Sequence, residues 1–213
     1  MRRCGVPAVK LEHFYHVYAT RAADKIVAEH LDALIKSGLA DHLDRLHLGI
    51  VGNPKARQRI IERCYRTIPT EVVAEADEGW EQVTLTALWE RRNSLRRPVL
   101  YAHTKGASDP TPWNSRWRRA MTAHLVTDWR TAVKRLSVAD VVGCNWIDES
   151  TRNSMHSSGI DFFAGNFWWA RADYLAKLAA PPNSTRWEAE VWIGTGLPRI
   201  FDMLPGFPSD VIR

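Results

Sequence analysis

A cationic turn follows a short apolar run in the middle of the chain, in the stretch YAHTKGAS (101–108). His103 and Lys105 stand two residues apart in this turn, and Gly106 follows directly. A turn that gathers positive charge at the end of a strand favours an anionic partner in general terms. A polar cap on the strand end is the alternative use of the same residues.

The densest aromatic segment is DFFAGNFWWARADYLAKL (161–178). Gly165 and Asn166 stand among its aromatic residues, and this combination indicates a backbone that approaches a ligand closely. The chain also contains ten tryptophans, whose flat faces stack on sugars and bases. A buried strand with bulky side chains is the competing interpretation.

Two acidic pairs offer carboxylates for chemistry. Glu188 and Glu190 precede an apolar run in RWEAEVWIG (186–194), although a carboxylate is also common at a helix start. Glu75 and Asp77 form E-x-D near the end of TEVVAEADEG (70–79), which places two oxygen ligands on one side of an extended segment. The sequence holds no G-x-x-x-x-G-K-[ST], G-x-G-x-x-G, G-x-S-x-G, H-E-x-x-H or D-x-D motif. The first four absences weigh against kinase-like, dinucleotide-binding, α/β-hydrolase and zincin proteins.

The elements that must position these residues alternate between strand and helix. Apolar and β-branched runs predict strands at 13–20, 43–53, 70–79, 97–103 and 139–146. Helical spacing predicts helices from 21 to a stop at Gly38, from Pro54 to about Arg66, over 80–95, and along an apolar face from Trp117 to Leu136. A further amphipathic helix is expected after the aromatic segment, up to 178.

This alternation predicts a doubly wound α/β fold with a mostly parallel sheet flanked by helices. Ligands of such sheets lie at the carboxyl ends of strands, so we expect the chemistry after Tyr101, after Val142 and after Val73. The segment 147–161, rich in Ser, Asn and Gly, predicts an exposed loop that orders over a ligand. Residues 204–213 are expected to form an extended surface tail.

Length and composition fit one globular domain. The chain has 213 residues, of which 45% are hydrophobic and 25% are charged. The net charge of +5 favours nucleic acid, a nucleotide or a membrane as partner. However, the basic residues form short clusters of the kind found on solvated helix faces. These clusters are Arg91-Arg92, Arg96-Arg97, Arg116-Arg118-Arg119 and Lys134-Arg135.

Targeting and redox signals are weak. No stretch reaches about 18 apolar residues, and no apolar region follows the charged start, so we expect no membrane span and a cytoplasmic location. Cys4, Cys64 and Cys144 are odd in number, far apart and outside any C-x-x-C pair. Reduced thiols are therefore expected rather than a disulfide framework or a zinc site.

Three segments in this order and spacing resemble a known family. YAHTKGAS, then WRRAM, then FFAGNFWWARADYLAKL are similar to glycosyltransferase-like proteins of bacteria and their viruses, which carry an H-[ST]-K-G turn and a G-N-F-W-W segment. GWEQVTLTALW (79–89) also resembles the E-x-x-T-L helix that these proteins have upstream. The resemblance covers roughly residues 13 to 195.

The resemblance implies a GT-A-like (Rossmann-like) fold, in which a single domain, here 1–213, moves a sugar from a nucleotide-sugar donor to a glycan or protein acceptor. It implies an enzyme of the hexosyltransferase kind, with a UDP-sugar as the favoured donor. In many GT-A enzymes a D-x-D motif holds Mn²⁺ or Mg²⁺ on the diphosphate, whereas this chain has His103-Thr104-Lys105 there. The metal assignment therefore stays open, and the cations are expected to replace part of the metal's charge.

Site roles follow from the same resemblance. The diphosphate is assigned to His103, Thr104, Lys105 and Gly106, with a further phosphate contact from Arg116 or Arg119. Glu190 is the first choice and Glu188 the second for the carboxylate that takes the acceptor's proton in an inverting transfer. Asp77 ranks lower, as a nucleotide or metal contact. The sugar and acceptor are assigned to Gly165, Asn166, Phe167, Trp168 and Trp169, and the two tryptophans are not expected to face the ligand together because strand neighbours alternate sides.

Two alternatives from other classes remain. A carbohydrate-binding protein or degenerate transferase would bind a sugar without turnover, consistent with the missing D-x-D. A nucleic-acid-binding protein would use the basic clusters and the aromatic residues, but the chain has no recognisable recognition motif. Oligomeric state is not predicted.

Overall fold

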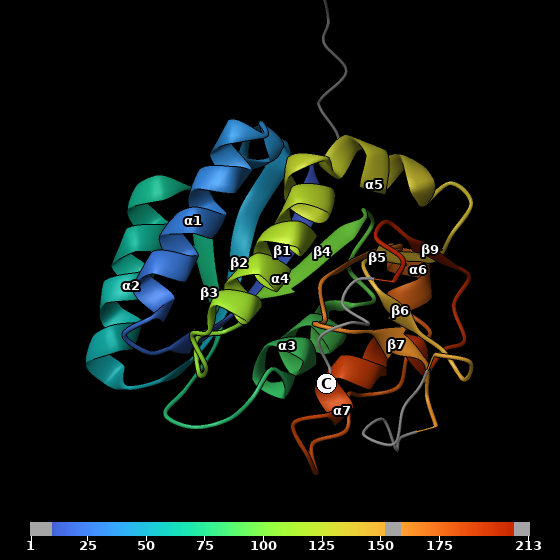
Figure 1. Cartoon of the computed structure of the whole chain (residues 1–213). Coiled ribbons are helices and arrows are strands. Elements are labelled where there is room, and N and C mark those ends of the chain that lie inside the picture. Colours follow the sequence, from blue (N-terminus) through green and yellow to red (C-terminus); the bar gives the residue numbers. More distant parts are fainter. Residues whose placement is uncertain (1–9, 152–158, 207–213) are drawn as a thin grey trace, which may run out of the picture.

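Seven strands form one sheet in the order β3-β2-β1-β4-β8-β5-β9 (Figure 1). The structure is a computed structural model that describes residues 10–151 and 159–206. The strands of the sheet are β1 (Leu11–Ala19), β2 (Leu43–Gly52), β3 (Thr70–Ala76), β4 (Val99–His103), β5 (Val141–Gly143), β8 (Trp168–Ala170) and β9 (Ile200–Asp202). Every neighbouring pair is parallel except the two pairs that involve β8. The predicted α/β fold with a mostly parallel sheet is confirmed.

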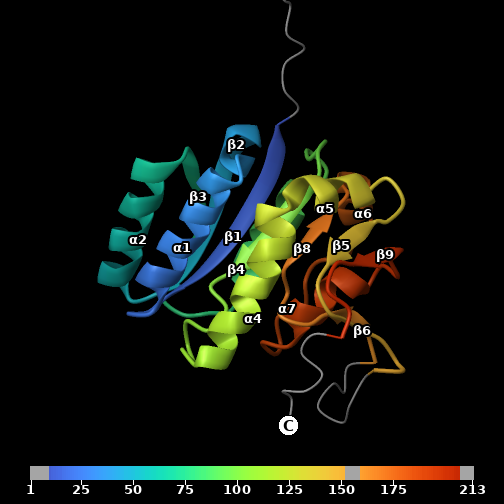
Figure 2. The same cartoon turned by 45° about the horizontal axis from the view of Figure 1, so that its top comes forward.

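Helices cover both faces of this sheet in a Rossmann-like arrangement (Figures 1 and 2). They are α1 (Ala23–Lys36), α2 (Pro54–Thr67), α3 (Gln82–Arg91), α4 (Pro112–Thr122), α5 (Trp129–Arg135), α6 (Ala172–Leu175) and α7 (Glu188–Val191), with short 3₁₀ turns at Leu39–His42 and Trp192–Gly194. A small hairpin of β6 (Trp146–Ile147) and β7 (Phe162–Phe163) lies beside the sheet. No helix in the described ranges is both long and apolar enough for a membrane crossing.

Local signals explain where the first helices begin and end. Asn53 caps α2, because its side-chain oxygen accepts hydrogen bonds from the backbone N–H groups of Lys55 and Ala56. Pro54 is the first residue of α2, where a proline loses no helical hydrogen bond. Gly38 follows α1 with a φ of 73°, the left-handed conformation that ends many helices. These starts and stops agree with the sequence predictions.

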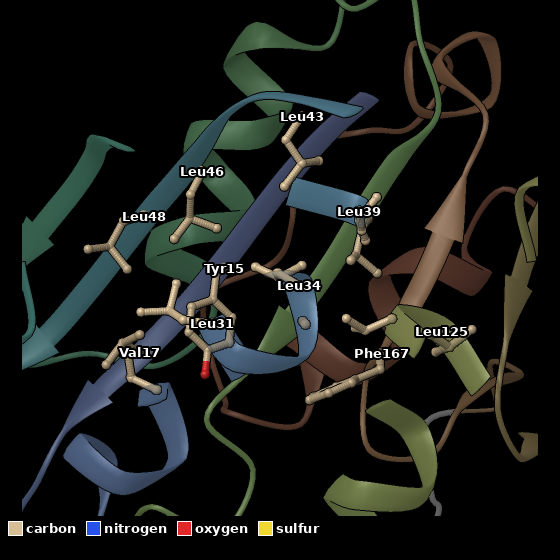
Figure 3. Packing of buried hydrophobic residues seen from close by; sticks show 14 of the residues in the cluster. Tyr15, Val17, Leu31, Leu34, Leu39, Leu43, Leu46, Leu48, Leu125 and Phe167 are labelled. Atoms are coloured by element: carbon tan, nitrogen blue, oxygen red, sulfur yellow. The ribbon is translucent and has the colours of Figure 1, made fainter. Parts of the chain in front are cut away.

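Two apolar clusters fill the two faces of the sheet. The larger one packs α1, α2, α4 and α5 on one face, and the other packs α3, α6 and α7 on the opposite face. Figure 3 shows Leu31 and Leu34 of α1 beside Tyr15 and Val17 of β1 in the larger cluster. Side chains of β4 alternate between the clusters, as the pleat requires, with Leu100 and Ala102 in the larger one and Val99 and Tyr101 in the other.

One long helix was expected from Trp117 to Leu136, but the structure has α4, a π-helical turn (Ala123–Thr127) and α5. The backbone N–H of Asp128 donates to the carbonyl of Ala123, five residues back. Within this turn the carbonyl of Leu125 accepts a hydrogen bond of 2.8 Å from the indole N–H of Trp169. A π turn frees such carbonyls, so a tertiary contact accounts for the interruption. The predicted apolar face is kept, because Met121, Leu125 and Leu136 are buried.

The strand order reverses between β1 and β4. The chain moves outward from β1 to β2 and β3, then returns to place β4 on the other side of β1. In open α/β sheets a crevice forms at such a switch point, outside the carboxyl ends of the two strands. Those ends are Ala19 in β1 and His103 in β4, so the cationic turn stands at the switch point.

Candidate functional site

A cavity of about 490 Å³ opens at this switch point. Its wall combines the end of β1, the segment after β3, the cationic turn after β4 and the start of α7. The lining residues are His16, Tyr18, Gly79, Trp80, Glu81, His103, Thr104, Lys105, Gly106, Ala107, Ser108, Asp109, Asn114, Arg186 and Glu190. Five residues that sequence reasoning proposed for the site therefore meet here: His103, Thr104, Lys105, Gly106 and Glu190.

The cationic turn is fixed by hydrogen bonds to β1. The backbone N–H of Thr104 donates to the carbonyl of His16 at 3.0 Å, and its hydroxyl accepts from the backbone N–H of Tyr18 at 2.9 Å. The buried guanidinium of Arg118 donates to the carbonyl of Lys105 at 2.8 Å. Gly106 has a φ of 87°, a conformation that favours glycine. The turn is therefore held in place before any ligand arrives.

Two cations line the cavity without carboxylate partners among the residues that the structure describes. The ammonium group of Lys105 lies 3.9 Å from the ring centroid of Trp117, a cation–π contact. Arg186 approaches from the segment before α7 and stacks at 4.9 Å on its exposed neighbour Trp187. Since neither cation is neutralised by a carboxylate, both can attract an anionic ligand.

A buried hydrogen-bond network forms the floor of the cavity around Glu81. One carboxylate oxygen of Glu81 accepts hydrogen bonds from the Tyr101 hydroxyl at 3.0 Å and from the Asn166 amide at 2.7 Å. Its other oxygen lies 3.4 Å from Nδ1 of His103. Nε2 of His103 lies 2.9 Å from the carbonyl of Gly165. The G-N-F-W-W segment therefore holds both Glu81 and His103 in position.

Burial fixes the protonation of this network. Desolvation lowers the pKa of His103 to about 3, so the imidazole is neutral near pH 7. Because a carbonyl only accepts, Nε2 carries the single ring proton and Nδ1 presents a lone pair to Glu81. Desolvation also raises the pKa of the Glu81 carboxyl, which favours a proton on the oxygen that faces His103.

The E-x-x-T-L segment carries Glu81 to the cavity through a close contact between α3 and the sheet. The Thr84 hydroxyl lies 2.7 Å from Nδ1 of His16. Thr84 also packs on β2 at Gly49, where a Cβ would overlap the Thr84 side chain. A glycine at this position lets α3 approach the strand closely enough for Glu81 to reach β4.

Gly165 and Asn166 were expected to approach a ligand, but the structure places protein atoms there. Gly165 has a φ of 87°, and a Cβ on it would lie 2.9 Å from the sulfur of Met121 and 3.0 Å from the Trp117 ring. Asn166 has a φ of 50° and is fully buried. The close approach that the sequence indicated is made by α4.

The two tryptophans of the same segment also lie in the core. Trp168 and Trp169 have no exposed surface and point to opposite faces of the sheet, as strand alternation predicted. The Trp168 indole donates to the Asn166 side-chain oxygen at 2.8 Å and stacks at 5.1 Å on Tyr101. Phe167 is buried and packs edge-on against His103 at 5.3 Å. None of these three rings lines the cavity, since each is covered by protein.

The two acidic candidates before the last helix differ in surroundings. A carboxylate oxygen of Glu188 accepts hydrogen bonds from the backbone N–H groups of Ser184 and Thr185, so Glu188 closes the turn that leads into α7. Glu190 lines the cavity and makes no side-chain hydrogen bond or ion pair within the part of the chain that the structure describes. Only Glu190 is placed for contact with a ligand.

Three other predicted contacts lie away from the cavity lining. Asp77 forms an ion pair with Arg57 at 2.7 Å. Arg119 forms one with Glu29 at 3.3 Å. Arg116 lies over Trp113, with 5.5 Å between the guanidinium carbon and the ring centroid.

Tyr18, Trp80, Glu81 and Arg186 are among the cavity residues that were not identified from the sequence as site residues. Tyr18 and Trp80 are 41% and 48% exposed, so part of each aromatic ring is open to the cavity or to solvent. Glu81 stood within the quoted E-x-x-T-L resemblance, and Arg186 directly precedes the acidic pair. Between 10–151 and 159–206, no group of three or more His, Cys, Asp or Glu side chains is arranged to hold a metal ion.

Comparisons with known proteins add a family and distant structural likenesses. A family model described as "Domain of unknown function (DUF8361)" matches residues 14–192. The chain is similar to the crystal structure of 4-diphosphocytidyl-2C-methyl-D-erythritol synthase from Anaerococcus prevotii DSM 20548, at 10% identity and a TM-score of 0.48, covering 94% of this chain and 91% of that one. A second crystal structure of a synthase of this name gives 11% identity and a TM-score of 0.42, covering 84% of both chains. No curated protein matches the sequence.

Proposed function

Because the chain belongs to the DUF8361 family, whose description assigns no activity, we propose from the switch-point cavity that it transfers a sugar from a nucleotide-sugar donor to an acceptor hydroxyl. The observation that carries this proposal is that one cavity brings together two cations and one carboxylate that form no ion pair with any residue the structure describes. Lys105 and Arg186 supply the cations and Glu190 the carboxylate. Cations bind the diphosphate of the donor, and a carboxylate takes the proton of the acceptor hydroxyl.

In this proposal the donor lies along the carboxyl ends of β1 and β4. Lys105 and Arg186 bind the diphosphate, and His103 and Thr104 hold the turn that carries Lys105. The exposed faces of Tyr18 and Trp80 offer stacking surfaces for the nucleotide base. The resemblance noted in the sequence favours a UDP-sugar.

The transfer step uses the carboxylate of Glu190. Glu190 accepts the proton of the acceptor hydroxyl, and the hydroxyl oxygen forms a bond to the anomeric carbon of the donor sugar. The bond between that carbon and the β-phosphate oxygen breaks, and the nucleoside diphosphate leaves. Lys105 and Arg186 stabilise the charge that develops on this leaving group. The acceptor is a glycan or a protein hydroxyl, and we propose that the whole site belongs to one domain spanning 1–213.

The cavity's own cations supply part of the positive charge that a divalent ion gives in D-x-D enzymes. A Mg²⁺ or Mn²⁺ ion on a diphosphate needs only one or two protein carboxylates beside the phosphate oxygens. Asp109 is the cavity carboxylate that fits such an ion, because Glu81 is tied to Tyr101 and Asn166 and Glu190 is assigned to the acceptor's proton. Comparing donor binding with a divalent ion and in EDTA therefore shows how much of the positive charge the ion provides.

A thermal-shift screen identifies the donor class. UDP-, GDP- and dTDP-sugars are each added with Mn²⁺, Mg²⁺ or EDTA, since a ligand that binds only the folded state raises its stability by about 2.7 kcal/mol at 100 times Kd. A selective shift with one nucleotide class is expected, and its size in EDTA measures the share of charge that the protein supplies.

A transfer assay then separates the enzyme from a binding protein. The donor identified in the screen is incubated with oligosaccharide and protein acceptors, and release of nucleoside diphosphate is followed with and without acceptor. Acceptor-dependent release is expected. A thermal shift with no release for wild-type protein would favour a carbohydrate-binding or degenerate transferase, and no shift with any nucleotide would remove the proposed donor site.

A further inference from the structure

A second cavity, of about 430 Å³, lies at the opposite end of β4. Its residues come from the segment before β4 and from the end of β8 and α6: Arg92, Asn93, Leu95, Arg96, Arg97, Pro98, Arg171, Ala172, Asp173 and Ala176. We call it the arginine cavity, because four of these residues are arginines and only one carries a carboxylate. The register between Val99 of β4 and Ala170 of β8 brings the two segments together.

Most of the positive charge in the arginine cavity is not neutralised. Arg171 is paired with Asp173, through contacts of 2.9 and 2.5 Å. Arg96 donates only to the loop carbonyls of Asn93 and Leu95. Within 10–151 and 159–206, Arg97 makes no hydrogen bond or ion pair. Guanidinium groups crowded in one hollow repel each other unless an anion binds between them.

Arg92 has a hydrogen-bond donor without an acceptor among the described residues. Its guanidinium lies 3.8 Å from the ring centroid of Trp89, and one of its terminal nitrogens donates to the Trp89 carbonyl at 2.7 Å. Its Nε is buried and has no hydrogen-bond partner among the described residues. A buried donor without a protein acceptor is uncommon in native proteins, and a bound anion can supply the acceptor.

We propose that the arginine cavity is a binding site for a small phosphate-bearing ligand, separate from the switch-point cavity. The planar guanidinium group binds phosphate oxygens through paired hydrogen bonds, and three such groups here have no carboxylate partner in the described part of the chain. The volume suits a small molecule. A nucleic-acid strand would instead need a basic groove that continues along its backbone.

The two sites can be tested independently. β4 has five residues from Val99 to His103, so its length places the cavities roughly 15 Å apart at about 3.3 Å per strand residue. A substitution at Lys105 therefore weakens the switch-point cavity without touching the arginine cavity. The inference does not depend on the proposed transfer activity, since it concerns binding alone.

The test is a calorimetric titration of inorganic pyrophosphate into the full chain carrying Lys105→Met, at fixed pH and salt. We expect one binding site in this variant. Adding Arg96→Gln and Arg97→Gln should reduce its affinity about tenfold or more, because two charge-assisted contacts are lost. Both side chains are exposed and Arg97 makes no hydrogen bond or ion pair in the described chain, so Arg97→Gln alone serves as the variant least able to disturb folding.

The matched control adds Arg63→Gln and Arg66→Gln instead. These residues are exposed on α2, and their loss changes the net charge by the same amount. Equal weakening in both sets, or no binding to the Lys105→Met protein at all, would overturn the proposal. A further outcome would also overturn the proposal, in favour of nucleic acid as the ligand. In that outcome the Arg96 and Arg97 variants lose binding of a single-stranded oligonucleotide but keep their affinity for pyrophosphate.

Discussion

The two ends of β4 carry opposite kinds of polar environment. At the carboxyl end, Lys105 and Arg186 share a cavity with Glu190 and with the coupled pair Glu81 and His103. At the amino end, four arginines share a cavity with one carboxylate. A carboxylate that can take a proton, placed beside cations, supports a reaction, whereas a set of guanidinium groups stays charged and supplies no group that transfers a proton. The same strand therefore separates a proposed reaction site from a proposed binding site.

The interior of β4 explains this separation. Val99, Leu100, Tyr101 and Ala102 are fully buried, so polar groups gather only before and after the strand. The cationic turn is tied to β1 by backbone and hydroxyl hydrogen bonds, while in the segment before β4 the Pro98 carbonyl accepts from the backbone N–H of Glu12 and Arg96 donates to carbonyls of its own loop. Substitutions at the carboxyl end are thus expected to change reactivity, and those at the amino end to change only binding.

Glu190→Gln gives the largest expected effect. If Glu190 takes the acceptor's proton, the transfer rate falls by about 10²–10⁴-fold while donor binding is kept. The measurement is a rate of nucleoside diphosphate release with acceptor, next to the thermal shift by donor. Glu188→Gln is the matched control, since Glu188 caps a turn and should leave the rate nearly unchanged. Similar rates for Glu190→Gln and wild type would mean that a group other than Glu190 accepts the proton of the acceptor hydroxyl.

Lys105→Met should lower turnover by about 10²–10³-fold, because a cation that stabilises the leaving diphosphate is lost. Its melting temperature without ligand should change little. Among the described residues, the Lys105 ammonium group contacts the face of the Trp117 ring and forms no hydrogen bond or ion pair. Lys134→Met on α5 provides the control for loss of one charge. Unchanged turnover in Lys105→Met would remove the diphosphate role from the cationic turn.

Asn166→Ala should lower the free energy of unfolding by about 1–3 kcal/mol, because buried hydrogen bonds to Glu81, Trp168 and the Ala189 carbonyl lose their partner. Urea denaturation measures this change. Asn166→Asp keeps the oxygen that accepts from Trp168 but loses the amide donor to Glu81 and to the Ala189 carbonyl, so it tests the donated bonds of this network alone. A wild-type unfolding curve for Asn166→Ala would contradict the described network.

His103 gives the carboxyl end of β4 a pH dependence that comes from a buried imidazole. Its pKa is about 3 in the folded protein and 6.5 in the unfolded chain, so the unfolded state binds more protons between these values. His103 therefore favours folding fully above pH 6.5, and this contribution is lost as the pH falls towards 3. His103→Gln should reduce the slope of unfolding free energy against pH near pH 5 by up to about 1.4 kcal/mol per unit. An unchanged slope in urea titrations from pH 7 to 4.5 would show that His103 is not buried as a neutral ring.

Arg97→Gln gives the smallest expected effect on the fold, within about 0.5 kcal/mol, because the side chain is exposed. Thermal melting without anions measures it. The affinity for pyrophosphate should still be lower in this variant than in wild type. A large loss of stability would mean that Arg97 supports the fold and would weaken the contrast between the two ends.

The sequence predicted most of the fold because its local signals were strong. β3 and α3 fall within the expected ranges 70–79 and 80–95, and α2 starts at Pro54 as expected. The reversed strand β8 and the π turn were missed, since both depend on tertiary contacts such as the Trp169 bond to Leu125. Residues 152–158 of the predicted loop and 207–213 of the predicted tail lie outside the described ranges.

The candidate site was predicted in part for a similar reason. Lys105 and Glu190 reach the cavity because turn position and helix start are local properties. Whether Trp168 and Trp169 meet a ligand or the core depends on the neighbours of β8, which no local pattern fixes. Glu81 meets Asn166 across 85 positions of sequence, so its place beneath the cavity became visible only in the folded chain.

Donor protection of Lys105 against chemical acylation tests the central claim most directly. Lysines of wild-type protein are labelled with and without a saturating nucleotide-sugar from the thermal-shift screen, and the rate at each site is measured by mass spectrometry. We expect the donor to slow labelling of Lys105 and to leave Lys55 on α2 and Lys134 on α5 unchanged, because only Lys105 lines the switch-point cavity. Equal labelling of Lys105 in the saturated and free protein, or the absence of any nucleotide-sugar that binds, would contradict the assignment of the donor to this cavity.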